Sequence, residues 1–298
     1  MTSGAFAMNA KRKPNRPNRA AGGPPPATEE FGPVVDSLQH PRAVEIRALL
    51  HRSGRAETGR MIIDDEENIL QAIEAGIELV SVFHAGEGSV PERVQAALSE
   101  RVGVYEVARR TSKKLFGAEK SARLFAIART PQPRPLSSLE ESSRDIVVLD
   151  DVGIMGNIGA IMRTSLALFA GGMVLLDFDP IDLYDRRLIR ASRGYVFSLP
   201  VVTATTEEFV AFCREREIPL LVTAIEATSS IAEVSAMSQR IAIAFGSEKR
   251  GCSAELSAGA NVQVRIPMDP RVESLNVSAT AGIMLHSRLG FNRPETED

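Results

Sequence analysis

The segment from Leu149 to Ser165 contains the first group of residues that could do chemistry. Three glycines, Gly153, Gly156 and Gly159, lie three residues apart and lead into a helical stretch. A dinucleotide-binding loop uses the spacing G-x-G-x-x-G instead. The pattern therefore disfavours a nicotinamide-dependent oxidoreductase, which stays open as an alternative.

Two polar side chains of this segment are candidate site residues. Asn157 is placed where it can cap the start of the helix. Arg163 follows one and a half turns later, among apolar neighbours, where an arginine is costly unless it has a purpose. Both residues are therefore expected to face a ligand or a substrate.

Two further loops follow buried strands. The apolar run at residues 241–245 ends at Gly246, and Ser247 and Glu248 come next. Glycine lets a ligand approach the backbone closely, and an ordinary turn does not explain an acid beside a buried strand end. In the third loop Pro267 closes a strand, and Ser274 begins the approach to an Ala/Gly-rich helix.

The elements that position these loops alternate between strand and helix from residue 145 onward. The predicted strands are 145–150, 173–177, 199–203, 219–225, 241–245 and 261–267, and the predicted helices are 158–169, 183–191, 207–217 and 276–289. Val/Ile/Leu-rich strands separated by helices indicate a parallel sheet covered on both faces. Because ligands bind beyond the carboxyl ends of such strands, the loops after Asp150, Phe245 and Pro267 are expected to form one site.

Four regions are expected along the chain. Residues 1–30 include the run KRKPNRPNR and predict a disordered basic tail, either a solubilising or expression remnant or an arm attracted to nucleic acid. Residues 31–130 predict a small α/β domain with a helix beginning near Asp64. Residues 131–144 are rich in proline and predict an extended, poorly packed linker. Residues 145–298 form the second domain.

Charge and composition exclude several classes of protein. The 35 Lys and Arg against 38 Asp and Glu give a net charge of −3, which excludes a globally basic protein but not a local basic patch. Two cysteines and four histidines make neither a disulfide framework nor a zinc site, so no metal is expected. No apolar run is long enough to span a membrane, and the N-terminus lacks the apolar core of a secretory signal, so a cytoplasmic location is expected.

A local basic stripe lies between residues 103 and 129, with seven basic residues against two acidic ones. A solvated face is the simplest interpretation of such a run, and a phosphate backbone is the alternative partner. On the second interpretation, the RNA-binding candidates are Arg109, Arg110, Lys113, Lys114, Lys120 and Arg123.

Taken in order, the three loops resemble the three motifs of the SpoU (TrmH-type) branch of the SPOUT RNA methyltransferases. The matching stretches are NIGAIMRT at 157–164, FGSEKRG at 245–251, and IPM at 266–268 with SLNVS at 274–278. The stretch RRLIRASRGYVFSLPVV at 186–202, together with the small N-terminal domain, is most similar to the thiostrepton- and nosiheptide-resistance rRNA methyltransferases.

The resemblance implies an α/β fold, with a knotted (trefoil) parallel-sheet SPOUT catalytic domain preceded by a small L30e-like RNA-binding domain. It implies a homodimer that transfers a methyl group from S-adenosylmethionine to the ribose 2′-hydroxyl of an adenosine. That adenosine would lie in the thiopeptide-binding region of 23S rRNA, giving resistance to nosiheptide and thiostrepton. A SpoU-type enzyme acting on tRNA or another rRNA nucleotide, and a non-catalytic RNA-binding module, are the alternatives.

The resemblance also implies roles for individual residues. Arg163 is the family's proposed activator, with Asn157, Glu248, Ser274 and Asn276 around the reacting centre. Arg193 would act across the dimer or on the cofactor carboxylate. The cofactor-binding candidates are Arg163, Arg193, Ala224, Gly246, Ser247, Glu248, Ile266, Pro267, Met268, Ser274, Leu275 and Asn276.

Overall fold

The computed structural model describes residues 33–86, 88–117, 122–247 and 249–294. These residues belong to one compact unit, Pro33–Asp298. The expected basic tail at residues 1–30 and two candidate site residues, Lys120 and Glu248, lie outside the described residues.

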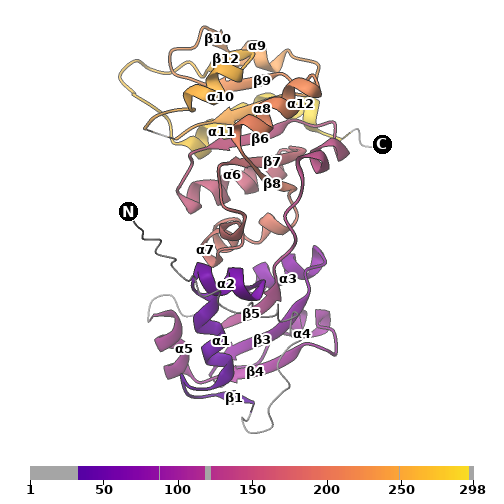
Figure 1. Cartoon of the computed structure of the whole chain (residues 1–298), viewed down its shortest axis with the longest axis vertical. Helices are drawn as coiled ribbons and strands as arrows, with labels where there is room; N and C mark the ends of the chain where they lie inside the picture. The colour runs from indigo at the N-terminus through magenta and orange to yellow at the C-terminus, as the bar shows by residue number, and fades with distance from the viewer. Residues whose placement is uncertain (1–32, 87, 118–121, 248, 295–298) are drawn as a thin grey trace, which may run out of the picture. The chain divides into compact units, whose positions relative to one another are not determined.

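The first layer consists of a five-stranded sheet and the helices that pack on it. The sheet has the order β1-β4-β3-β5-β2, and β5 pairs antiparallel with β2 and β3 (Figure 1). Its strands are β1 Val34–Val35, β2 Arg60–Asp64, β3 Leu79–Ala85, β4 Gly103–Val107 and β5 Leu124–Arg129. Its helices are α1 Pro41–Leu49, α2 Arg52–Thr58, α3 Glu66–Glu74, α4 Glu92–Ala97 and α5 Arg109–Phe116. The core of one face contains Phe83 stacked on Phe125, with ring centres 4.8 Å apart.

The helix predicted to begin near Asp64 begins two residues later, and Asp64 is the buried last residue of β2. The apolar run Met61–Ile63 forms a fully buried strand, and Asp65 breaks it with a left-handed φ of 66°. Glu66 and Glu67 then supply the negative charge that favours a helix N-terminus. The acidic run therefore predicts the helix correctly, but its first acid, Asp64, belongs to the preceding strand β2.

The second layer is a seven-stranded sheet of order β10-β12-β9-β11-β6-β7-β8 in which every neighbouring pair is parallel (Figure 1). Its strands are β6 Ile146–Asp150, β7 Gly172–Leu176, β8 Val201–Ala204, β9 Leu220–Thr223, β10 Ser229–Ser230, β11 Ala242–Phe245 and β12 Val262–Arg265. Its helices are α6 Met155–Ala167, α7 Arg186–Ala191, α8 Thr206–Glu215, α9 Ile231–Ser235, α10 Ala254–Gly259, α11 Val277–Ser287 and α12 Leu289–Asn292.

Both faces of this sheet are buried, as the Val/Ile/Leu-rich strands predict. Along β6, Val147 and Leu149 belong to a core that includes residues of α6, α7 and α11. Ile146 and Val148 belong to the opposite core, with residues of α8 and α10. Alternate residues of one strand thus pack against different helices, which is the double coverage that a parallel sheet requires.

The proline-rich segment 131–144 is better packed than its composition predicts. Residues Leu136–Glu141 form a 3₁₀ helix, η1, and Leu139 is fully buried. A Cβ on Gly172 of β7 would lie 2.5 Å from a Leu139 methyl carbon. Arg240 donates hydrogen bonds to the carbonyl oxygens of Leu139 at 2.7 Å and Arg144 at 2.6 Å. Leu139 of the predicted linker therefore belongs to the second layer's core, and Leu136 packs against that core.

A buried ion pair joins the C-terminal helices to the start of β6. Arg288 donates from Nε and Nη2 to the carboxylate of Asp145 at 2.8 and 3.0 Å, and both side chains are fully buried. Asn292 of α12 donates to the same carboxylate at 3.0 Å and accepts from the Asp145 backbone N–H at 2.8 Å. Because each group has its partners, this cluster fixes the end of the chain against the sheet.

Candidate active site

A cavity of about 540 Å³ opens at the carboxyl ends of β9, β11 and β12. Its volume lies in the range of small-molecule sites. Seven of the residues expected to bind a cofactor line it: Ala224, Gly246, Ser247, Ile266, Met268, Ser274 and Leu275. The cavity therefore opens at two of the predicted strand ends, after β11 and β12, whereas no described residue of the loop after Asp150 lines it.

Direct contacts bring the three loops together. The Asp150 carboxylate at the end of β6 accepts a hydrogen bond at 2.6 Å from the backbone N–H of Ser253, just past the second loop. The Asn276 side chain donates at 3.3 Å to the side-chain oxygen of Asn157, which joins the third motif to the first. The convergence expected from strand order is therefore present in the folded chain.

The second loop is a closed turn built around Gly246. Ser247 and Gly251 exchange backbone hydrogen bonds of 3.1 and 2.8 Å, and Gly251 has a left-handed φ of 68°. A Cβ on Gly246 would overlap the Gly251 carbonyl carbon. Arg250 pairs with Asp151 of the first loop. Glycine at position 246 is therefore required by the turn itself, and this turn forms one wall of the cavity.

Asn276 is the N-cap of α11, and Asn157 is not the cap of its own helix. The Asn276 side-chain oxygen accepts from the backbone N–H of Ser278 at 2.9 Å, the usual capping geometry. Helix α6 begins at Met155 with Ile154 at its N-cap, so Asn157 is already the third helical residue. Its side-chain oxygen instead accepts a hydrogen bond from Asn276, and this bond joins the first motif to the third.

Among the described cofactor-binding candidates, two arginines and two other residues do not line the cavity of this chain, and neither does the catalytic candidate Asn157. Arg163 is exposed on α6, while its neighbours Ile161 and Met162 are buried. The prediction that Arg163 has apolar surroundings is therefore wrong. A helix turns successive residues to different faces, and the apolar ones face the core. Arg193 is exposed in the turn after α7. The other two expected residues absent from the lining are Pro267 and Asn276.

The cavity also has residues that sequence reasoning missed. Charged side chains at its wall are Glu226, Lys249, Arg250 and Arg265. Each lies within a few residues of a predicted strand end, which is the signal that could have found them. Cys252 lines the cavity as well, and burial raises the pKa of its thiol to about 12, with the nearby Asp150 adding to the effect. That thiol is therefore protonated at neutral pH and is not poised as a nucleophile.

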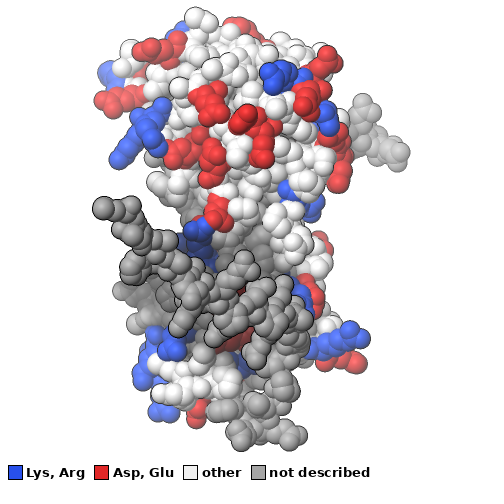
Figure 2. Space-filling view, in the orientation of Figure 1, with Lys and Arg blue, Asp and Glu red and all other residues white. Residues whose placement is uncertain are grey.

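Helix α5 presents the basic stripe on one exposed face. Arg109, Arg110, Lys113 and Lys114 are exposed, whereas Thr111, Ser112, Leu115 and Phe116 are buried. Arg123, just before β5, is exposed too. Figure 2 shows Lys and Arg side chains gathered where α5 lies, and many Asp and Glu side chains over the seven-stranded layer.

The described residues contain neither a membrane-spanning helix nor a metal-binding cluster. None of the helices they form combines the length and the apolar character needed to cross a membrane. Within the same residues, no three His, Cys, Asp or Glu side chains are grouped so that they could hold a metal ion.

Both layers of the chain match known protein families. Residues 145–286 match the SpoU rRNA methylase family, and residues 32–142 match the N terminus of the thiostrepton-resistance methylases. A 23S rRNA (adenosine(1067)-2′-O)-methyltransferase of Streptomyces laurentii is 41% identical over 260 residues, which cover 87% of this chain and 92% of that protein.

Solved structures of other proteins are similar to this chain over nearly the same share of its length. A crystal structure of an RNA 2′-O ribose methyltransferase is 31% identical, with a TM-score of 0.72, covering 87% of this chain and 98% of that one. An AdoMet-bound rRNA methyltransferase from Sinorhizobium meliloti is 27% identical, with a TM-score of 0.73, covering 86% of this chain and 98% of that one.

These matches confirm the fold class expected from the three motifs, a SPOUT α/β catalytic domain preceded by a smaller α/β domain. The converging loops and the cavity lie within the segment that matches the SpoU family. On this evidence the chain belongs to the SpoU rRNA methylases and is a methyltransferase of the thiostrepton-resistance type.

Proposed function

We propose that this chain transfers a methyl group from S-adenosylmethionine to the ribose 2′-hydroxyl of an adenosine in the thiopeptide-binding region of 23S rRNA. The modification would give resistance to thiopeptide antibiotics such as nosiheptide and thiostrepton. The observation that carries the proposal is the 41% identity to the Streptomyces laurentii enzyme, which extends through the N-terminal layer as well as the catalytic one. Action on ribosomal RNA would make it a cytoplasmic enzyme.

The cavity fits S-adenosylmethionine in size and in chemistry. Ile266 and Leu275 provide apolar walls for an adenine, and the turn at Gly246 exposes backbone groups to it. Among the described lining residues, Lys249 and Arg265 offer positive charge to the cofactor's carboxylate. The bound cofactor supplies an activated methyl group on a good leaving group, so the protein's own task is alignment and proton removal.

Arg163 acts on the substrate by electrostatics in this proposal. A guanidinium keeps its proton at neutral pH and is a poor base. Its positive charge fixes the ribose–phosphate and lowers the pKa of the 2′-hydroxyl, so that the proton leaves as the oxygen attacks. Asn157 and Asn276 hold the first and third motifs together beside that centre. Ser274 lines the cavity next to them.

A homodimer completes the site in this proposal. Neither Arg163 nor Arg193 lines the cavity of its own chain, and both are exposed. Ile154 beside α6 and Ile283 on α11 are 59% and 41% exposed. The Gly282 position on α11 lies toward α6 of the same chain, because a Cβ added there would lie 3.8 Å from a Thr164 methyl carbon. The exposed apolar residues of these helices are therefore the surface proposed for the second copy.

The basic face of α5 is the proposed contact with RNA. Its four exposed cations lie on consecutive turns of one helix face, with Arg123 as a fifth candidate. Phosphate contacts of this kind supply affinity and set the position of the RNA without reading its sequence. The proposed division of labour gives residues 31–130 to RNA binding and residues 145–298 to methyl transfer, with 131–144 between them.

A methyl-transfer assay tests the proposal. The full chain is incubated with radiolabelled S-adenosylmethionine and a short rRNA fragment containing the thiopeptide site, in its ribose form and with the candidate adenosine as its 2′-deoxy form. Label is expected in the first fragment and not in the second. Equal label in both would exclude ribose methylation at that nucleotide. A parallel incubation with tRNA in place of the fragment tests the alternative substrate, which label found only on tRNA would favour.

A further inference from the structure

The turn that follows α7 ends the helix with two left-handed residues. Arg193 and Gly194 both have left-handed φ angles, of 53° and 78°. The Gly194 N–H donates to the Ile189 carbonyl at 2.9 Å, and the Arg193 N–H donates to the Arg190 carbonyl at 3.1 Å. Glycine adopts this conformation freely, but arginine seldom does. The two hydrogen bonds are those of a helix C-cap, and Phe169 after α6 and Glu217 after α8 have the same left-handed φ with the same bonds. Local hydrogen bonds therefore account for the conformation at Arg193, and the neighbours of the turn decide where it lies.

Helix α3 of the five-stranded layer packs directly against this turn. Gly194 is buried, and a Cβ placed on it would lie 2.8 Å from Cβ of Gln71 and 3.2 Å from Cα of Asn68. Asn68 is itself held, since its side chain donates to the Asp64 carbonyl at 2.8 Å. The two layers thus touch at a place with no room for even a methyl group.

The other side of the same turn supports the helix of the first motif. A Cβ on Gly159 of α6 would lie 2.5 Å from the carbonyl carbon of Ala191 and 2.6 Å from the backbone nitrogen of Ser192. Ser192 is fully buried, and its hydroxyl donates to the Ile189 carbonyl at 3.0 Å. The end of α7 therefore lies between α3 and the helix that carries Arg163.

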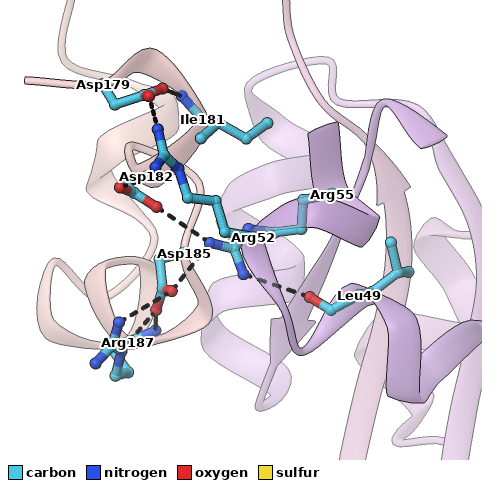
Figure 3. Close-up of polar contacts among 8 residues, drawn as sticks. All are labelled: Leu49, Arg52, Arg55, Asp179, Ile181, Asp182, Asp185 and Arg187. Atoms are coloured by element: carbon cyan, nitrogen blue, oxygen red, sulfur yellow. Dashed lines mark hydrogen bonds and ion pairs between the residues drawn. The ribbon is translucent and has the colours of Figure 1, made fainter. Parts of the chain in front are cut away.

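Ion pairs fix the start of α7 in place. Arg55 of α2, 3% exposed, donates to Asp185 at 3.1 Å and to the Leu49 carbonyl at 3.4 Å (Figure 3). Arg186 pairs with the buried Asp64 of β2 and lies over the Phe116 ring at 4.4 Å. Such buried, hydrogen-bonded pairs hold one arrangement because any displacement leaves a charge uncompensated.

From these contacts we propose that α3, packed against Gly194, sets the position of the Arg193–Gly194 turn and so positions Arg193 and the α6 helix for methyl transfer. Gly194 and Gln71 are then positioning residues, and the N-terminal layer does more than bind RNA. The inference rests on the proposed function, because the roles of Arg193 and Arg163 come from it.

The test compares two alanine substitutions that impose the same backbone strain. Gly194→Ala adds a methyl group against α3, whereas Gly76→Ala adds one at a φ of 75° with no atom within 4 Å. Gly76→Ala should keep methyl transfer within about twofold of the wild type. Gly194→Ala should lower kcat on the rRNA fragment about 100-fold, the loss expected from a misplacement of about 1 Å. Equal activities of the two variants would overturn the proposal.

A double-mutant cycle with Arg193→Ala identifies the residue that is displaced. If Gly194 acts through Arg193, the double variant should be no less active than Arg193→Ala alone. Losses that multiply would overturn that link. Gln71→Gly removes the two Gln71 atoms nearest the added methyl group, so the pair Gly194→Ala/Gln71→Gly should regain activity, and a pair that does not would also count against the proposal.

Binding of S-adenosylmethionine, measured by calorimetry on the same full-length variants, separates this inference from the proposed function. The Kd of Gly194→Ala should shift as that of Arg193→Ala does, whether or not the rRNA fragment is the substrate. A wild type that binds the cofactor but does not methylate the fragment would contradict the proposed substrate. A Kd unchanged in Gly194→Ala but shifted in Arg193→Ala would contradict the inference.

Discussion

Arg163 lies on the solvent side of α6, and its neighbours Ile161 and Met162 fill the core beneath it. Its removal therefore changes little in the packing of the helix. We expect Arg163→Ala to abolish detectable methyl transfer, a loss of at least about 100-fold, because it removes charge stabilisation at the reacting oxygen. Thermal unfolding should be unchanged, since exposed substitutions seldom shift stability. Wild-type turnover in this variant would refute the assignment.

Gly246 imposes a different constraint, because the turn around it has no room for a side chain. Gly246→Ala places a methyl group into the Gly251 carbonyl carbon, so the turn must move away from the cavity. We expect the affinity for S-adenosylmethionine to fall more than about tenfold by calorimetry. Gly153→Ala is the matched control, because no atom lies within 4 Å of its added carbon. Equal affinities of the two variants would mean that the turn does not shape the cofactor site.

At the scale of the element, α5 separates a buried face from a charged one. Lys113→Ala/Lys114→Ala should weaken RNA binding and lower the slope of log K against log salt by about 2, about 1 per lost phosphate contact. Filter binding across a salt series measures the slope. Arg214→Ala, an exposed cation on α8 of the other layer, is the control and should leave the slope unchanged. A slope lowered by about 1 in Arg214→Ala, half the change in the double variant, would assign the effect to net charge alone.

The C-terminal helices depend on the pair between Arg288 and Asp145. Arg288→Met leaves the fully buried carboxylate of Asp145 without its cation and should cost about 3–5 kcal/mol of unfolding free energy. Arg216→Met, which breaks an exposed pair with Glu140, should show no measurable change. Urea unfolding followed by circular dichroism compares the two. A loss in Arg288→Met no larger than in the control would show that the buried pair does not hold α11 and α12.

At the scale of the whole molecule, Asp64 links the two layers and makes stability depend on pH. Burial raises the pKa of its carboxyl from 3.8 to about 6, and the pairs with Arg186 and Arg190 oppose this only in part. The folded chain therefore holds this proton more tightly than the unfolded chain does. The resulting stabilisation is complete below about pH 4 and is lost as the pH rises through about 6, by up to about 3 kcal/mol.

Asp64→Asn tests this dependence, because the amide does not titrate. Urea unfolding of both proteins between pH 4.5 and 7.5 should show the wild type losing stability relative to the variant as the pH rises over that range. Comparing the two proteins cancels the other titrating groups. A constant difference across the range would show that Asp64 titrates near its ordinary pKa in the folded chain.

The pattern of strands and loops can be predicted from the sequence because it rests on local rules. Buried parallel strands are apolar on both faces, so β6, β7 and β9 stand out as Val/Ile/Leu runs. The parallel order puts their carboxyl ends at one edge, so the location of the site follows from the strand pattern alone. The motifs at those ends identified the family, and the comparisons confirmed it.

Other elements were missed for equally local reasons. Helices α1 and α2 have no strong apolar stripe, since α1 buries only Ala43, Ile46 and Leu49. Strand β10 has two residues and α9 has five, too few for a periodic pattern to appear. The packing of Leu139 could not be expected either, because the contact with Gly172 joins residues far apart in the chain.

By itself, the amino-acid sequence determined the family, the parallel sheet and the edge at which the ligand cavity lies, because apolar runs and turn residues act within a few positions of each other. Only the tertiary structure decided that Asn157 meets Asn276, that Arg163 is exposed, and that α3 presses on Gly194. These outcomes depend on which surfaces meet after the chain folds back on itself. Contacts between segments far apart in the sequence depend on how their surfaces fit and are buried, so no local sequence pattern predicts them.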